Sequence, residues 1–405
     1  MKIVVCLYTL EVGGSQINAI EIAAAVARAG HEVIIYGPDG DLRPMVRDAD
    51  LEFVEGPARD RPRLSARATR QIADLTRRRK IDVIHSYESI PAMDAAIGSH
   101  LWRGTPLVTT VLSMSVPKYL PTHVPLIVGT QEIVDREGGR RAWVELMEPP
   151  VDTGANAPIA DNAAARARFG LAPSDCAVVS ISRLVPSLKL EGILAAARAV
   201  RQIGAEYQDL RLLIVGDGEA RDLVERAAEE TNAALGRTAV SLVGQLVDPR
   251  DAYAAADIVI GMGGSALRAM AFAKPLIVQG ECGFWLPLTP KTLDVFLEQG
   301  WYGTGGGDDG APRVAQVLRD LVRSPERRRE LGAFGREVVT ERFSLDVAAK
   351  RQVEIYHAVL ARRTGFARRA TSMAETAAHY AWFRAVWLRR LVGKARRPVA
   401  QGPGR

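Results

Sequence analysis

Short apolar runs alternate along the first third of the chain with longer stretches in which apolar residues recur at helical spacing. Residues 2–8 and 31–37 are such runs and predict buried strands, whereas residues 17–30 have the period of a helix that ends at Gly30. The same pattern predicts strands over 48–56, 81–87, 105–112 and 124–130, and helices over 68–80 and 92–104. Strands that alternate with helices favour a parallel sheet with right-handed crossovers.

The pattern fails from residue 144 and restarts at residue 176, and the Pro- and Gly-rich residues 147–158 predict a linker. Beyond it, strands are predicted over 176–184, 210–218, 239–245 and 257–264, with helices over 190–204, 219–230 and 248–256. We therefore expect an α/β protein of two Rossmann-like, doubly wound parallel-sheet domains that face a cleft. The expected parts are residues 1–150, a linker 151–174, residues 175–345, a helix 346–362 that could cross back to the first domain, and a basic tail 363–405.

Glycine turns follow several of the predicted strands: Gly13-Gly14 in the first half, Gly216 and Gly263-Gly264 in the second. Because ligands of doubly wound sheets bind at the carboxyl ends of the strands, these turns predict a site in the cleft. None of them is the dinucleotide fingerprint or the P-loop. Arg268 lies one turn into the helix that begins at Gly263-Gly264. An anion held at that helix N-terminus and an arginine that only reaches solvent are both compatible with this position.

Charge and composition limit the classes of binding partner that we expect. Residues 362–405 contain eleven basic residues and one acid, a net charge of +10 against +6 for the whole chain, so residues 1–361 carry −4. This distribution argues against a nucleic-acid groove on the folded domains. Three widely spaced cysteines predict neither disulfides nor a metal site, and no signal peptide or membrane span is expected, so a cytoplasmic protein is favoured.

The order and spacing of several segments resemble one known family. The segments are VGGSQINAIEIAAAVARAGHEV, IDVIHSYE, EPPVD, SRLVPSLKLEGILAAARAV, LLIVGDGEARDLVERAAEE, LVGQLVD, DAYAAADIVIG, RAMAFAKPLIV and ERFSLDVAAKRQVEIY. Over about residues 1–360 the chain resembles the retaining GT-B glycosyltransferases of glycosyltransferase family 4. The resemblance implies a nucleotide-sugar donor held mainly by the second domain and an acceptor held mainly by the first. It also implies transfer with retention and no required metal or other cofactor.

By this resemblance, Arg183 and Lys189 are the family's basic pair. Two fixed cations would stabilise the negative charge that develops on a leaving diphosphate. The further residues implied to bind the donor are Gly13, Gly14, Gly216, Gly244, Gln245, Leu246, Val247, Gly263, Gly264, Ser265 and Arg268. His85 and Tyr87 are implied catalytic positions, and Glu88 is a candidate acceptor contact. A core histidine with a satisfied ring is the alternative for His85.

The sequence departs from the family in two places. The family usually has two glutamates eight positions apart near the glycine turn, where this chain has Ile260 and Arg268. Relatives often have H-x-H where this chain has His85 and Tyr87, and a tyrosine is a poor base near neutral pH. The departures leave open a catalytically silent sugar-nucleotide-binding module or partner subunit. A sugar-nucleotide epimerase fits the basic pair less well than a transferase does.

The sequence says less about the role of the basic tail and about the identity of the acceptor. Residues 375–397 place apolar residues near helical spacing among arginines, which suits either a helix on an anionic membrane surface or a helix packed on the first domain. Packing is favoured, and peripheral membrane contact through 363–405 stays open. We expect a small-molecule acceptor, such as a natural product, nucleoside or aminocyclitol, with a glycolipid as the alternative. The oligomeric state is open.

Overall fold

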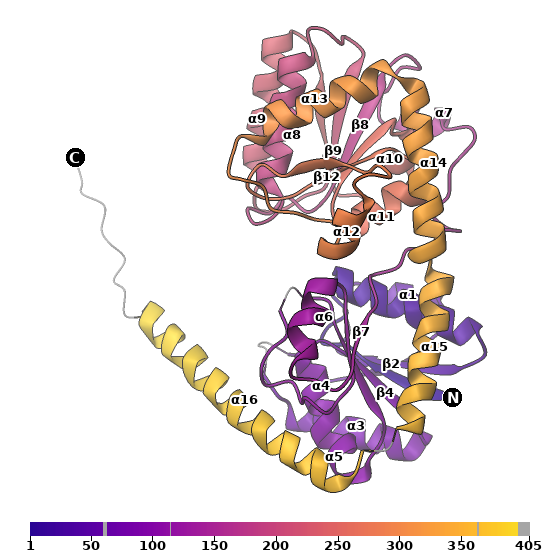
Figure 1. The fold of residues 1–405 in the computed structure, drawn as a ribbon, viewed down its shortest axis with the longest axis vertical. Helices are drawn as coiled ribbons and strands as arrows, with labels where there is room; N and C mark the ends of the chain where they lie inside the picture. Colours follow the sequence, from indigo (N-terminus) through magenta and orange to yellow (C-terminus); the bar gives the residue numbers. More distant parts are fainter. Residues whose placement is uncertain (60–62, 114, 363, 396–405) are drawn as a thin grey trace. The chain divides into compact units, whose positions relative to one another are not determined.

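The computed structural model describes residues 1–59, 63–113, 115–362 and 364–395 (Figure 1). Contacts divide the chain into two compact units. Unit 1 contains residues 1–129 and 133–147 together with the chain from residue 349 onward, and unit 2 contains residues 130–132 and 148–348. Each unit has its own sheet, so the expected fold class of two parallel-sheet α/β domains is confirmed.

Unit 1 is built on a seven-stranded parallel sheet of order β3-β2-β1-β4-β5-β6-β7. Its strands are β1 (Lys2–Cys6), β2 (Glu32–Gly37), β3 (Glu52–Glu55), β4 (Val83–Tyr87), β5 (Leu107–Val111), β6 (Leu126–Val128) and β7 (Val144–Leu146). Its helices are α1 (Gly14–Arg28), α2 (Arg43–Asp48), α3 (Ala66–Arg79), α4 (Ser89–Ala95), the π-helical turn η1 (Ala96–His100), α5 (Leu101–Arg103), α15 (Leu345–Ala361) and α16 (Phe366–Ala395), with most of α6 (Gln131–Gly138).

Unit 2 has a six-stranded sheet of order β10-β9-β8-β11-β12-β13, in which only β13 is antiparallel to its neighbour. Its strands are β8 (Cys176–Ile181), β9 (Leu210–Val215), β10 (Val240–Gly244), β11 (Ile258–Gly261), β12 (Leu276–Gln279) and β13 (Trp285–Pro287). Its helices are α7 (Ala163–Arg168), α8 (Leu190–Ile203), α9 (Arg221–Leu235), α10 (Arg250–Ala255), α11 (Gly264–Ala271), α12 (Leu293–Gln299), α13 (Gly310–Arg323) and α14 (Pro325–Arg342).

Both sheets are apolar on their two faces, which is why their strands read as continuous hydrophobic runs. In unit 2 the alternate residues Val178 and Val179 of β8 belong to different buried clusters. Each sheet reverses its strand order once, between β1 and β4 in unit 1 and between β8 and β11 in unit 2. The loops that leave the carboxyl ends of these strands diverge, and such switch points are where open α/β sheets bind ligands.

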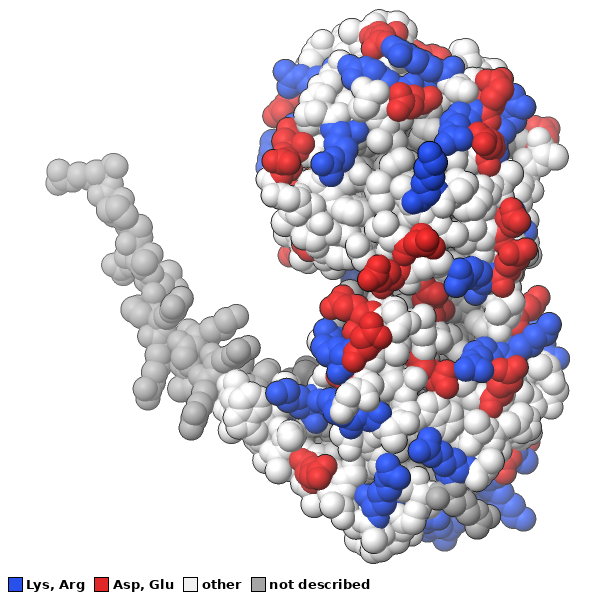
Figure 2. Space-filling model, viewed as in Figure 1, with Lys and Arg blue, Asp and Glu red and all other residues white. Residues whose placement is uncertain are grey.

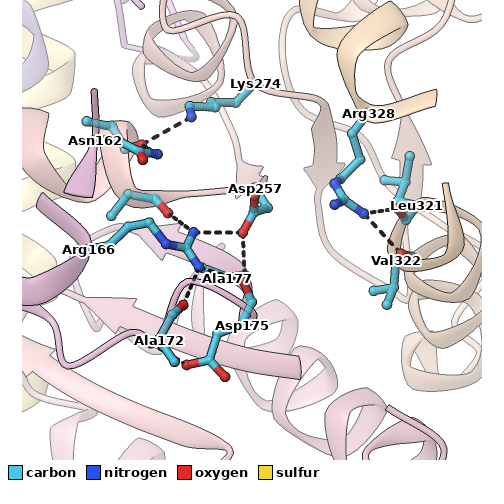
Figure 3. A network of polar contacts seen from close by, with 12 residues as sticks. Asn162, Arg166, Ala172, Asp175, Ala177, Asp257, Lys274, Leu321, Val322 and Arg328 are labelled. Atoms are coloured by element: carbon cyan, nitrogen blue, oxygen red, sulfur yellow. Dashed lines mark hydrogen bonds and ion pairs between the residues drawn. The ribbon is translucent and has the colours of Figure 1, made fainter. Parts of the chain in front are cut away.

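The expected linker over 151–174 is part of unit 2 instead. It contains α7, whose buried Arg166 contacts several backbone carbonyls and one carboxylate of unit 2 (Figure 3). The Arg166 guanidinium donates to the Ala255 and Ala172 carbonyls at 3.1 and 2.9 Å and pairs with Asp257 at 3.0 Å. One long side chain therefore fixes a Pro- and Gly-rich segment that has no apolar periodicity. The apolar pattern did not detect β7 either, because this strand is only three half-buried residues long.

The chain returns to unit 1 within α15 and then continues into α16. The Tyr356 hydroxyl of α15 hydrogen-bonds the buried His85 ring of β4 at 2.8 Å. The first half of α16 also packs on this unit, where the Tyr380 hydroxyl accepts from the Leu64 N–H at 3.1 Å and Met373 is buried. None of the helices searched, in the described part of the chain, is long and apolar enough to span a bilayer.

Candidate functional site

The predicted basic pair lies on the loop between β8 and α8, at the switch point of unit 2. The Ser182 N–H donates to the Val215 carbonyl at 3.0 Å, and the Leu184 N–H donates to the Asp217 carbonyl at 2.9 Å. These bonds bring the loop against the turn after β9. The approach is so close that a Cβ on Gly216 would lie 1.8 Å from the Ser182 carbonyl oxygen. Gly216 is therefore needed to shape the loop that carries Arg183 and Lys189.

The electrostatics of this loop favour an anion. Burial, together with the nearby Arg183 charge, lowers the pKa of Lys189 to about 8. Within the described residues, neither the Arg183 nor the Lys189 side chain has an acidic ion-pair partner. Two neighbouring cations without a counter-charge raise the free energy of the empty loop, and an anionic ligand such as a diphosphate would lower it.

The turn between β11 and α11 faces the same switch point. Gly263 has φ 54° and ψ −130°, a conformation open almost only to glycine, and it caps α11. The Ser265 hydroxyl closes the turn by bonding the backbone of Met262 at 3.1 and 3.0 Å. Arg268 folds back along this helix, because one of its terminal nitrogens lies 3.8 Å from where a Cβ of Gly264 would be. The guanidinium therefore lies beside the first turn of α11.

Ile260 does not occupy a ligand-facing position. It is fully buried inside β11 and pairs with Ser180 of β8. Only Met262 and Gly263 separate β11 from α11, so a residue eight positions before Arg268 falls within the strand. The comparison of spacing with the family therefore breaks down at the first glutamate position, and of the two positions only Arg268, in α11, lies beside the glycine turn.

The residues predicted to frame the nucleotide base lie at the end of β10. Gly244 has φ +85° and its carbonyl accepts from the Gly216 N–H at 2.9 Å. Gln245 is exposed, Leu246 packs partly on the core, and Val247 is fully exposed. An exposed valine beside backbone groups without a sheet partner suits the face and edge of a planar base.

Two glutamates hold the basic loop: Glu281, which the sequence suggested only as a possible partner of Arg268, and Glu191, which was not predicted as a site residue. Glu281, after β12, accepts from the Leu188 N–H at 3.2 Å and from the Tyr302 hydroxyl at 2.7 Å. Glu191, in the first turn of α8, accepts from the Cys282 and Gly283 N–H groups at 3.0 and 2.6 Å. The segment after β12 and the segment around Lys189 thus each supply a carboxylate that accepts hydrogen bonds from the backbone of the other. An acid two residues after Lys189 was the available sequence signal.

In unit 1, Glu88 lies at the switch point after β4. Its carboxylate accepts from the Leu112 N–H at 3.1 Å and from the hydroxyls of Ser113 and Ser15 at 3.0 and 3.4 Å. Glu88 itself has φ 69°, a left-handed conformation uncommon for this residue type. The carboxylate therefore joins the loops after β1, β4 and β5, and it is half-exposed. This placement suits the predicted acceptor contact.

His85 and Tyr87 lie deeper than the sequence predicted. His85 is buried, and its two ring nitrogens bond the Tyr356 and Thr110 hydroxyls at 2.8 and 2.7 Å. Burial lowers the pKa of His85 to about 3, so the ring is neutral. Tyr87 is also buried, which raises its pKa, and its ring is tilted by 35° against that of His85, with the ring centroids 4.6 Å apart. The packing gives both residues a structural position, and their implied catalytic contacts stay predictions.

Gly13 and Gly14 lie where they were predicted, at the start of α1. Gly13 has extended backbone and accepts from the Ile17 N–H at 3.0 Å, and Gly14 is the exposed first residue of the helix. The first turn of any helix leaves N–H groups without helical partners, so this end suits an anionic group.

The surface charge is mixed. On the face drawn in Figure 2, acidic and basic side chains are interspersed over both units. Ion pairs such as Arg221 with Glu225 at 2.9 Å account for part of this pattern. Among the described residues, no group of three or more His, Cys, Asp or Glu side chains is arranged to hold a metal ion.

Comparison with known proteins agrees with this geometry. A model described as Glycosyltransferase Family 4 matches residues 12–129, and one described as Glycosyl transferases group 1 matches residues 175–284. Together the two models span more than half of the chain. The first lies within unit 1 and the second within unit 2, where it includes the basic pair.

Curated relatives are named as glycosyltransferases. The chain is 25% identical over 405 aligned positions to a D-inositol 3-phosphate glycosyltransferase of Kineococcus radiotolerans, which covers 86% of this chain and 91% of the relative. It is 28% identical over 210 positions to a GDP-mannose-dependent monoacylated alpha-(1-6)-phosphatidylinositol monomannoside mannosyltransferase of Corynebacterium glutamicum, covering 48% of this chain and 50% of the relative.

Solved structures share the fold. A glycosyltransferase of Rickettsia africae superposes with a TM-score of 0.71 at 16% identity, covering 89% of this chain and 98% of that one. The HepE protein of Anabaena, solved in complex with UDP, superposes with a TM-score of 0.69 at 17% identity, covering 88% and 100%. The chain therefore belongs to the GT-B glycosyltransferases of glycosyltransferase family 4, and it is an enzyme of the glycosyltransferase class.

Proposed function

We propose that the enzyme transfers a sugar, with retention of its anomeric configuration, from a nucleoside-diphosphate sugar bound on unit 2 to a hydroxyl of a small molecule bound on unit 1. The observation that carries the proposal is the pair Arg183 and Lys189. Both cations lie at the switch point of unit 2, and burial holds the pKa of Lys189 at about 8. A diphosphate is the anion whose two charged groups match two adjacent cations.

The chemistry follows from this pair. The bond between the anomeric carbon and the diphosphate oxygen breaks while a bond to the acceptor oxygen forms on the same face of the sugar. The acceptor proton passes to the leaving diphosphate, so no protein base is needed, in agreement with the buried positions of His85 and Tyr87. Arg183 and Lys189 stabilise the leaving charge, and we propose that they do so without a divalent metal.

Arg268 extends this donor site. Its guanidinium lies beside Gly264, at the end of α11 where the positive pole of the helix dipole also lies. Arg268 would hold either the distal phosphate or a carboxylate on the donor sugar. The Gly244 turn and the exposed Val247 would receive the base.

The acceptor argument rests on Glu88. Each hydrogen bond to its carboxylate described above comes from a neutral donor. A carboxylate with neutral neighbours repels an acceptor phosphate and attracts hydroxyl or ammonium groups. We therefore propose a neutral or amine-bearing polyol, such as a natural product, nucleoside or aminocyclitol. The relatives' names mention inositol-containing polyols that also carry a phosphate, and it is this phosphate that Glu88 disfavours in the acceptor of the present chain. A glycolipid with an exposed polyol is the second candidate.

Calorimetric titration with UDP, GDP and ADP and their common sugar conjugates tests the donor site. We expect one nucleotide series to bind, with affinity falling at least about tenfold in Arg183→Ala, as for a lost charge-assisted hydrogen bond. Arg201→Ala, which removes an exposed arginine from α8, is the matched control and leaves binding unchanged. Well-folded protein that binds no nucleotide would overturn the donor assignment.

The same titrations separate the two roles of Arg268. If Arg268 holds the distal phosphate, Arg268→Ala weakens the bare diphosphate and the sugar conjugate equally. If it holds a sugar carboxylate, only the conjugate is weakened. With the donor known, the anomeric coupling in the NMR spectrum of the product tests retention, and unchanged turnover after chelation with EDTA tests independence from metal. Tight donor binding without transfer or donor hydrolysis would favour the silent binding module.

A further inference from the structure

A groove lined by apolar side chains, of about 420 Å³, runs along the first half of α16. One wall is formed by Phe366, Ala370 and Met373 of α16, and the other includes Ile97 of η1 and Trp102 of α5. The spacing of the α16 residues places them on one helix face. The groove belongs wholly to unit 1.

Two large aromatic side chains are exposed beside this groove. Trp102 is 68% and Phe366 is 52% exposed, and their ring centroids are 6.1 Å apart. A contiguous exposed aromatic pair on a soluble surface marks a site of interaction. Tryptophan at the mouth of an apolar groove is typical of the boundary between lipid headgroups and acyl chains.

A basic pocket of about 650 Å³ lies next to the groove. Four arginines line it, Arg103, Arg362, Arg368 and Arg369, against a single acid, Asp82. None of the four arginines has an ion pair within the described residues, whereas the Asp82 carboxylate accepts from the Lys2 N–H at 2.7 Å. The pocket is therefore a concentration of positive charge that lacks its counter-charge.

The histidines of this pocket do not add to the charge. His100 and His123 bond each other through their Nε2 atoms at 2.9 Å, and the Nδ1 of His100 bonds the Thr105 carbonyl at 2.7 Å. Burial lowers the pKa of His100 to about 4 and that of His123 to about 3, and Arg369 contributes to both shifts. Near neutral pH the positive charge of the pocket therefore comes from its arginines, whereas the two imidazole rings are neutral.

Groove and pocket are two ends of one surface. Trp102 lines the groove and the next residue, Arg103, lines the pocket; Phe366 and Ala370 line the groove, whereas Arg368 and Arg369 line the pocket. The first turns of α16 thus separate an apolar channel from a cationic recess. The shape and charge match an amphiphile with an acyl chain and an anionic headgroup.

The surface lies away from the acceptor site of the same unit. The pocket is lined by the residues that precede β4, β5, β6 and β7, among them Asp82, Pro106, Pro125 and Trp143. It therefore lies at the amino ends of the strands, whereas Glu88 follows the carboxyl end of β4. A molecule in the pocket cannot contact Glu88.

We propose that this surface binds an anionic phospholipid of a membrane, with the phosphate in the basic pocket and an acyl chain in the groove. Two observations select a membrane lipid over a soluble amphiphile. Trp102 and Phe366 are exposed at the boundary between the charged and apolar parts. The sequence from residue 384 onward, which begins within α16, adds a further series of arginines and lysines that favours a negatively charged surface.

The test is co-sedimentation of the full-length protein with vesicles of phosphatidylcholine alone and of phosphatidylcholine mixed with phosphatidylglycerol. We expect binding only to the mixed vesicles. Trp102→Ser and the double variant Arg103→Gln/Arg368→Gln should each lower the partition coefficient roughly tenfold. The double variant Arg201→Gln/Arg226→Gln, which removes the same charge from exposed helix positions of unit 2, should bind like the wild type.

Trp382→Ser separates the groove from general adsorption of the basic helix, because Trp382 is as exposed as Trp102 but does not line the groove. Equal losses in the two tryptophan variants would overturn the proposal. So would competition by glycerol phosphate at the concentrations of lipid used, which would make the pocket a site for soluble anions. Quenching by brominated phosphatidylglycerol gives a second readout, and we expect part of it to disappear in Trp102→Phe.

Discussion

Glu281 accepts a hydrogen bond from the backbone N–H of Leu188, at 3.2 Å, across 93 positions of sequence. Leu188 has φ +66°, a left-handed conformation that costs free energy for a leucine, and it directly precedes Lys189. The bond from Glu281 helps to hold this strained residue in place. A carboxylate from the loop after β12 therefore orients the cation of the loop after β8.

Removing this carboxylate should loosen the basic pair. We expect Glu281→Ala to weaken nucleoside diphosphate binding about tenfold, since backbone strain of this kind is worth about 1–3 kcal/mol. Glu281→Gln keeps an acceptor oxygen and should retain most of the affinity. Leu188→Gly added to Glu281→Ala should restore binding, because glycine adopts the left-handed conformation freely. Calorimetry on the three variants checks this, and wild-type affinity in Glu281→Ala would show that the bond is dispensable.

Donor affinity should depend on pH through Lys189. Its pKa in the empty site is about 8, below the usual 10.5, so the side chain loses its charge as pH rises through 8. The diphosphate prefers the charged form, and we expect affinity to fall about tenfold between pH 7 and pH 9. Lys189→Arg stays charged and should bind with little pH dependence. The pH dependence that remains in Lys189→Arg reports any ionisation of the nucleotide itself. Parallel pH profiles of the wild type and Lys189→Arg would contradict the prediction.

The free energy of unfolding of the ligand-free protein should rise with pH over the range in which the donor affinity falls. The unfolded chain keeps the Lys189 proton up to its ordinary pKa of 10.5, whereas the folded protein releases it near pH 8. The unfolded state therefore binds more protons between these values, and stability gained from this residue rises with pH across the window. Urea unfolding at pH 7.5 and pH 9.5, with Lys189→Met as the non-titrating control, measures the difference.

Gly216→Ala should be far more damaging than a typical glycine substitution. Its φ is +148°, and the new Cβ would lie 1.8 Å from the Ser182 carbonyl oxygen, so the loop of the basic pair must move. We expect a loss of more than about 3 kcal/mol in the free energy of unfolding. Gly236→Ala also has positive φ, +63°, but meets no atom within 4 Å, and it should cost only about 1 kcal/mol. Equal losses would show that strain rather than the clash dominates.

His85 should make the protein sensitive to acid without taking part in transfer. Its pKa is lowered from 6.5 to about 3 by burial, so the unfolded state binds more protons between these values. Stability from this residue is therefore lost as pH falls, by about 2 kcal/mol at pH 5. His85→Gln can still bond Tyr356 and Thr110 but does not titrate, so its unfolding free energy should fall less between pH 7 and pH 5. Turnover lost in folded His85→Gln would restore the catalytic assignment.

The sequence predicted the two sheets because apolar strand runs are local signals, whereas the basic pair came from the resemblance to the family and stays a prediction. It did not predict that Arg166 ties residues 151–174 to unit 2, since that contact joins α7 to residues about ninety positions away. A buried His85 was one of the two predicted alternatives, but its partner Tyr356 could not be predicted, because it lies 271 positions later. Ile260 was correctly expected in a strand, but counting along the chain did not show that only two residues separate that strand from the helix of Arg268.

The bond between His85 and Tyr356 also bears on the order in which the protein is made. On the ribosome, almost the whole of unit 2 emerges as one continuous stretch, residues 148–348, and can fold as it appears. Unit 1 begins earlier but needs residues from 349 onward, so one ring nitrogen of His85 lacks its Tyr356 partner until α15 has been synthesised. The first unit to begin translation is thus the last to be completed.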